Sequence, residues 1–169
     1  MNIFEVIDKV EGSDAFKKFK DKSPKSYFCA AFFIIDYEAK DAKKQIDYYI
    51  SDEDVMTFTV EGESVKEMEA KLPKKEKIPE ILKEKVKLDE EKAIEIGKKE
   101  SEIGEFKKVI AVLQTLDGKP VWNLSCMKGL MMMRYHVSAE DGKVLKKEKI
   151  NLMDMMKFDD HKKTPDYIQ

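Results

Sequence analysis

The sequence contains few of the residue types that most often carry chemistry in proteins. Its 169 residues include two histidines, two cysteines and a single arginine. Neither His136 nor His161 has the paired histidine or cysteine neighbours of a structural zinc site, although Asp159 and Asp160 precede His161. The sequence therefore predicts no metal site and no cofactor. One alternative stays open, because the methionine-rich segment 127–133 offers the soft ligands that Cu(I) prefers.

Membrane-spanning and export segments are also not expected. The apolar runs fall well short of the ~18 residues that a membrane helix needs. Residues 1–12 carry acidic side chains where a signal peptide carries positive charge. Cys29 and Cys126 lie within apolar segments, which favours buried free thiols over a disulfide. We therefore expect a cytoplasmic protein with no membrane partner.

An excess of charge of one sign is absent as well. Lysine and arginine number 32 against 34 aspartate and glutamate residues, which gives a formal net charge of -2. Nucleic-acid-binding proteins more often carry a basic excess, so no nucleic-acid partner is expected. Hydrophobic residues make up 42% of the chain, which is enough to bury a core in one domain or two small ones.

Catalytic motifs are not found in the sequence. It has no Gly-x-Ser-x-Gly elbow, no phosphate-binding loop, no dinucleotide-binding glycine pattern and no metalloprotease helix. Some cone-shaped α+β folds use an aspartate in an apolar pocket to abstract protons, and only Asp36 and Asp47 are candidates for that role here. The sequence thus predicts a protein that is not an enzyme and has no catalytic residues.

Residues 119–147 carry the clearest structural signal, which predicts three short antiparallel strands. Residues 121–126 and 131–138 both alternate between apolar and polar side chains, as half-buried strands do. In the second of these strands, Tyr135 lies on the opposite side from Arg134. Glycines follow both strands, as tight turns require.

The first part of the chain, residues 1–72, is predicted to form helices followed by an antiparallel meander. Helical spacing in residues 1–10 is interrupted at Gly12, and Ser13 is a suitable N-cap for a second helix. Residues 27–37 form a strand that is apolar on both faces, so either another part of the chain or a second copy should cover the second face. Alternating strands are expected at residues 43–50 and 55–60.

Residues 73–88 are predicted to link two units. The surrounding segment is dense in lysine and glutamate and contains Pro73 and Pro79. Apolar spacing predicts one short amphipathic helix before Pro73 and another after Pro79. The residues that support these helices are Val65, Met68 and Leu72 in the first, and Ile81, Leu82 and Val86 in the second.

The second unit is expected at residues 89–158, followed by a polar tail at 159–169. Asp89 is a suitable N-cap, and the acidic residues after it favour a helix start. A strand at 106–115 is again apolar on both faces, and Asp117-Gly118 predicts a hairpin turn. Both units thus have the same order of elements, which predicts an α+β fold of two tandem helix-plus-antiparallel-meander units.

Four short motifs of the second unit carry a resemblance to a known family. They are Asp89-Glu90-Glu91-Lys92-Ala93-Ile94, Val121-Trp122-Asn123-Leu124, Met133-Arg134-Tyr135-His136-Val137 and Ala139-Glu140-Asp141-Gly142-Lys143-Val144-Leu145. Together they resemble the PepSY domain family, whose pattern is a helix followed by an antiparallel meander. The first unit lacks the tryptophan and the Gly-Lys-Val turn, so it is cystatin-like by topology only.

The resemblance implies a small non-catalytic module. PepSY-like domains occur beside metallopeptidases and in exported or membrane-attached proteins, and binding or inhibition of peptidases has been proposed for them. We expect no export signal, peptidase domain or membrane anchor in this chain. The resemblance therefore predicts the fold of the second unit, and this prediction does not depend on any role with peptidases.

These observations predict a non-enzymatic module that binds or regulates another protein or peptide, or that pairs with itself as a homodimer. The contact surface is expected on the concave face of the sheet or along an edge strand. The alternative is a small-molecule-binding protein, or an enzyme, with a pocket between helix and sheet. The candidate surface residues are Trp122, Tyr135, Arg134, His136, Met131 and Met133.

Overall fold

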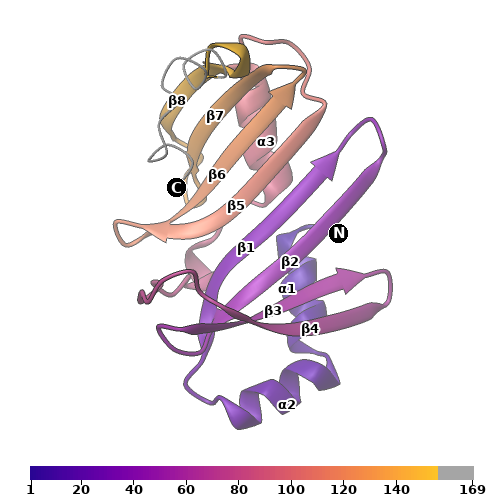
Figure 1. The fold of residues 1–169 in the computed structure, drawn as a ribbon, viewed down its shortest axis with the longest axis vertical. Helices are drawn as coiled ribbons and strands as arrows, with labels where there is room; N and C mark the ends of the chain where they lie inside the picture. Colours follow the sequence, from indigo (N-terminus) through magenta and orange to yellow (C-terminus); the bar gives the residue numbers. More distant parts are fainter. Residues whose placement is uncertain (156–169) are drawn as a thin grey trace, which may run out of the picture.

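The computed structural model describes residues 1–155, in which eight strands form one antiparallel sheet. The strand order is β4-β3-β2-β1-β5-β6-β7-β8, so each half of the sheet follows the chain order outward from the central β1–β5 pair (Figure 1). We call this central pair the seam. The strands are β1 (Tyr27–Asp36), β2 (Asp41–Tyr49), β3 (Asp54–Glu61), β4 (Ser64–Lys71), β5 (Lys108–Leu116), β6 (Lys119–Lys128), β7 (Met131–Ser138) and β8 (Val144–Asn151).

Three helices of the described chain pack against one side of the sheet, which we call the helix face. They are α1 (Ile3–Glu11) and α2 (Asp14–Lys22) in the first half and α3 (Glu90–Lys99) in the second, and in Figure 1 α1 and α3 lie behind the strands. Ser13 and Asp89 cap α2 and α3, each accepting a hydrogen bond from a backbone N–H of the first turn, as predicted. Within residues 1–155, no helix has the length and apolar content needed to cross a membrane.

The α+β class and most strands predicted from the sequence are confirmed. Residues 119–147 form β6, β7 and the start of β8, and Asp117-Gly118 forms the turn before them with positive φ at both residues. The strands predicted to be apolar on both faces are β1 and β5. They pair with each other, so the two halves share one continuous sheet.

The predicted helix over residues 65–72 is wrong, because this segment forms the edge strand β4. Gly62, with φ of 59°, allows a tight turn after β3, and the chain then pairs along the whole of β3. Lysine, glutamate, methionine and alanine favour helices, but they are also tolerated on the exposed edge of a sheet. The helix predicted after Pro79 is likewise wrong, since that segment contains only a short 3-10 turn, η1 (Lys83–Lys85).

The segment between β4 and α3 is packed against both halves of the sheet. Ile81 is only 1% exposed, and its backbone N–H donates to the Phe28 carbonyl at 2.8 Å. Further along, the Leu88 carbonyl accepts a hydrogen bond from the Trp122 indole Nε1 at 3.0 Å. These contacts attach the segment to β1 in the first half and to β6 in the second.

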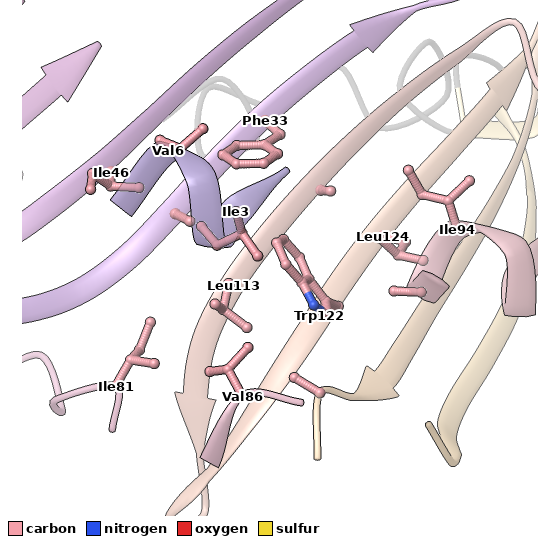
Figure 2. Packing of buried hydrophobic residues seen from close by; sticks show 14 of the residues in the cluster. Ile3, Val6, Phe33, Ile46, Ile81, Val86, Ile94, Leu113, Trp122 and Leu124 are labelled. Atoms are coloured by element: carbon pink, nitrogen blue, oxygen red, sulfur yellow. The ribbon is translucent and has the colours of Figure 1, made fainter. Parts of the chain in front are cut away.

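One core runs along the helix face and crosses the seam. Ile3 of α1, Phe33 of β1, Leu113 of β5 and Trp122 of β6 lie together in Figure 2, and all four are fully buried. The ring centroids of Phe33 and Trp122 are 6.0 Å apart. Burial of aromatic and aliphatic side chains from both halves therefore stabilises the seam.

A buried acid connects the two halves at the helix N-termini. Glu90, with no exposed surface, accepts a hydrogen bond at Oε1 from the Ile3 backbone N–H at 2.8 Å, and its Oε2 lies 3.6 Å from Lys44 Nζ. Desolvation raises the pKa of Glu90, while hydrogen bonds to backbone N–H groups and the Lys44 charge oppose that rise. Glu90 thus links α3 to α1 and to β2.

Candidate protein-interaction face

The side of the sheet opposite α1, α2 and α3 has no helix packed against it in the described chain, and we call it the open face. Residues directly opposite each other in antiparallel strands share a face, so the register defines rows of side chains across the sheet. One row on the open face reads, from β4 to β8, Lys66, Thr59, Gln45, Phe32, Val112, Asn123, His136 and Lys146. The next row reads, from β2 to β8, Lys43, Ile34, Ile110, Ser125, Arg134 and Glu148.

These rows are apolar only at the seam. Phe32 and Ile34 of β1 lie beside Val112 and Ile110 of β5, and we call these four residues the seam patch. All four are partly exposed, and none belongs to the core on the helix face. A solvated face of an antiparallel sheet normally carries polar side chains, as the neighbouring strands do here. The seam patch is therefore a contiguous apolar surface between polar neighbours in these two rows, while a further row of the same face carries the partly exposed Met127, Met132 and Ile150.

Positive charge gathers on the open face of the second half. Arg134 Nη1 lies 3.8 Å from Glu148 Oε2, and Lys146 Nζ lies 3.9 Å from the same oxygen. His136 lies in the next row, directly opposite Lys146. Partial burial lowers the pKa of His136, and the Lys146 and Arg134 charges lower it further. We call Arg134, His136 and Lys146 the basic corner.

Both edges of the sheet are dense in charge. β4 carries lysine or glutamate at half of its eight positions, and six of its residues are exposed. β8 has the sequence VLKKEKIN, with five consecutive exposed residues. Charged edge strands disfavour the addition of a strand from another chain. Of the two contact surfaces predicted from the sequence, the structure therefore favours the face of the sheet over an edge.

The prediction that six residues form one contact surface is wrong, because they lie on both faces of the sheet. Trp122, Tyr135 and Met133 are 0% exposed and lie in the core on the helix face. Arg134 and His136 point to the open face, while the partly exposed Met131 shares the face of Met133. Successive residues of a strand point to opposite sides, so residues 133–136 cannot all reach one partner.

The seam patch was missing from the candidate residues, although its signal was present in the sequence. Residues 27–37 and 106–115 are apolar on both faces, which predicted that each face is covered. The structure shows α1, α2 and α3 on one face only. The second face of β1 is the apolar area that the sequence predicted another part of the chain or a second copy to cover, and β5 extends it.

The two aspartates considered for catalysis do not meet in an enclosed apolar pocket. Asp36 Oδ1 accepts hydrogen bonds from the Glu38 and Ala39 backbone N–H groups at 3.0 and 2.9 Å, which closes the turn after β1. Asp47 lies half-buried on the open face and accepts a hydrogen bond from Thr57 Oγ1 at 2.8 Å. Burial raises the pKa of Asp47, and the Thr57 bond opposes that rise.

A cleft of about 350 Å³ lies between α2, the start of β1 and residues 80–84. Its polar groups already bind one another. Glu11 accepts a hydrogen bond from the Tyr48 hydroxyl at 3.0 Å and pairs with Lys83 Nζ at 2.8 Å. The Lys20 ammonium donates to the Ser26 carbonyl. A ligand in this cleft would have to displace these pairs, so the cleft is a weaker candidate site than the open face.

In residues 1–155, no group of three or more histidine, cysteine, aspartate or glutamate side chains is placed to hold a metal ion. Asp159, Asp160 and His161, together with the predicted tail 159–169, lie outside the described residues. Cys29 and Cys126 are free and buried, as predicted, and burial raises the pKa of each thiol to about 12.

Comparison with known proteins gives a likeness in fold alone. No protein-family model matches this chain, and no curated protein matches it. The crystal structure of a "putative lipoprotein" from Clostridium difficile 630 is similar, with a TM-score of 0.58 and 18% sequence identity. The likeness covers 81% of this chain and 91% of that chain. The resemblance to the PepSY family stays a prediction.

Proposed function

We propose that this chain is a non-enzymatic binding module whose open face contacts another protein. The proposal rests on the seam patch, four apolar side chains at the centre of a face against which α1, α2 and α3 do not pack. Burial of such a patch against a partner is favourable by ~25 cal/mol per Å² of apolar surface, before the cost of association. The charged edges on both sides of the sheet leave the face as the better contact surface.

The proposal includes two tandem units, the second of them PepSY-like. Its support is that four antiparallel strands, ordered outward from the seam, follow α1 and α2 in the first half and α3 in the second. Trp122 and Tyr135, which belong to the motifs that resemble PepSY domains, are both core residues. Those motifs would then specify the fold of the unit, and the function would lie in the exposed residues of the opposite face.

The partner in this proposal is a macromolecule, because the open face is broad and the seam patch is not enclosed. Small-molecule sites are usually concave and bury most of the ligand. A protein surface, by contrast, can cover an apolar patch together with its polar rim. A second copy of the chain remains one form that the partner can take.

Site-specific cross-linking in the native host tests this proposal. A photoreactive phenylalanine analogue replaces Val112 in the seam patch, and in a matched control it replaces the exposed Lys99 on α3. We expect a discrete adduct from position 112 and none from position 99, and an adduct of twice the chain mass would identify a second copy. Equal adducts from both positions, or none from position 112, would contradict the proposal.

A further inference from the structure

We infer that the partner of the open face is a protein whose contact surface places carboxylates beside apolar side chains, with the carboxylates bound by Arg134 and Lys146. This inference rests on the proposed function and specifies the chemistry of the partner. Its basis is the position of the basic corner in the same rows as the seam patch.

The charged residues of the open face are arranged differently in the two halves. From the seam toward β8, the rows continue through the polar residues Asn123 and Ser125 to His136, Arg134 and Lys146, with Glu148 as the acid of that corner. From the seam toward β4, Lys66 forms a close ion pair with Glu61 at 2.9 Å. In these two rows the first half therefore has Lys43 and the paired Lys66, whereas the second half brings Arg134 and Lys146 together around the single acid Glu148.

Arg134, the only arginine of the chain, has incomplete pairing in the structure. Its 3.8 Å distance to Glu148 is too long for a hydrogen bond, and Glu148 shares the same oxygen with Lys146 at 3.9 Å. A guanidinium group binds a carboxylate best through two parallel N–H donors. An incoming carboxylate could satisfy Arg134 in this way without breaking a short hydrogen bond.

The register sets the spacing that the partner must match. Arg134 on β7 and Ile110 on β5 lie in one row, two strands apart, with Ser125 of β6 between them. Neighbouring strands are ~4.8 Å apart, so the carboxylate of the partner should lie ~10 Å from its apolar anchor. Arginine and aromatic side chains carry much of the binding energy at protein interfaces, and Arg134 and Phe32 provide one of each here.

The test uses three defined peptides and the full chain labelled with ¹⁵N. The peptides alternate leucine with glutamate, leucine with lysine, or leucine with serine, and binding is followed by chemical-shift changes at low salt. The leucine–glutamate peptide should shift residues of β5 to β8, and its Kd should rise about tenfold in Arg134→Gln, the loss expected when one charge-assisted contact is removed. Lys66→Gln, which removes a charge from the other half of the same face, should change Kd less than twofold.

The outcomes separate this inference from the proposed function. Equal binding of the lysine peptide, displacement of the glutamate peptide by a short polyuridylate, or equal losses in Arg134→Gln and Lys66→Gln would each overturn the inference. The same titration with Phe32→Thr tests the face itself. If only Phe32→Thr weakens binding, the seam patch binds and the assignment of the carboxylates fails. If neither variant weakens binding, the proposed function fails as well.

Discussion

The two faces of the sheet differ in where their apolar residues lie. On the helix face, buried apolar side chains extend through six neighbouring strands, from Phe58 in β3 to Val137 in β7, and the partly buried Val144 of β8 packs against them. On the open face, the two rows through the seam patch become polar toward both edges, although Met127, Met132 and Ile150 form an apolar stretch of a further row. The helix face is explained by folding alone, because α1, α2 and α3 cover it. The seam patch has no such explanation within the described chain.

Truncation of Trp122 should give the largest effect and separate the two faces most clearly. Trp122 is fully buried and donates to the Leu88 carbonyl, so Trp122→Ala should lower the free energy of unfolding by about 3–5 kcal/mol. Phe32→Ala on the open face should cost about 1 kcal/mol or less, since Phe32 is outside the core. Urea unfolding followed by circular dichroism measures both, and similar losses would show that the two faces contribute equally to folding.

Glu90 provides a second comparison between buried and exposed positions, because it is a titratable group buried on the helix face. Glu90→Ala removes the acceptor for the Ile3 N–H and the partner of Lys44, so we expect a loss of about 3 kcal/mol. Glu91→Ala, one position further along the same helix and exposed, is the matched control and should cost less than about 0.5 kcal/mol. Equal effects in calorimetric unfolding would mean that the buried link does not hold the halves together.

Gly97 tests how closely α3 approaches the helix face. A Cβ atom at this position would lie 3.1 Å from the Tyr135 ring, so Gly97→Val should destabilise the fold by about 1–3 kcal/mol through overpacking. Lys99→Val on the exposed side of the same helix provides the control for helix propensity. Thermal unfolding compares the two variants. A Gly97→Val protein as stable as Lys99→Val would contradict the close packing of α3 on β7.

The pH dependence of stability gives the smallest expected effect. Because burial raises the pKa of Glu90, the folded protein holds this proton more tightly than the unfolded chain does. The stability linked to Glu90 is thus complete below the ordinary glutamate value of 4.5 and is lost as pH rises through the folded-state pKa. Glu90→Gln should therefore gain stability relative to the natural chain as pH rises above 4.5. Urea unfolding at several pH values checks this, and a constant difference would show that Glu90 has an ordinary pKa.

Local sequence patterns were sufficient to predict much of the fold. The alternation in residues 119–147, the caps Ser13 and Asp89 and the turn at Asp117-Gly118 all depend on neighbouring residues and were predicted correctly. β4 was mistaken for a helix because Val65, Met68 and Leu72 also have helical spacing. Its true state depends on pairing with β3, which is a tertiary contact that composition alone does not specify.

The candidate site was harder to predict for a physical reason. Alternation shows that Tyr135 and Arg134 lie on opposite sides of β7, but it does not show which side the helices cover. Pairing of β1 with β5 joins residues about 80 positions apart, such as Phe32 and Val112, and no local pattern specifies that contact. Two strands that are each apolar on both faces become one surface patch only when this pairing is known.

The most direct test of the account measures stability and binding in the same variant. Phe32→Thr combined with Ile110→Thr replaces two of the four apolar side chains of the seam patch, one on each strand, with a residue that favours strands. We expect the free energy of unfolding to change by about 1 kcal/mol or less, while the cross-link from position 112 and the binding of the leucine–glutamate peptide are lost. A loss of several kcal/mol in stability with binding unchanged would show that these residues serve the fold and that the open face is not the contact surface.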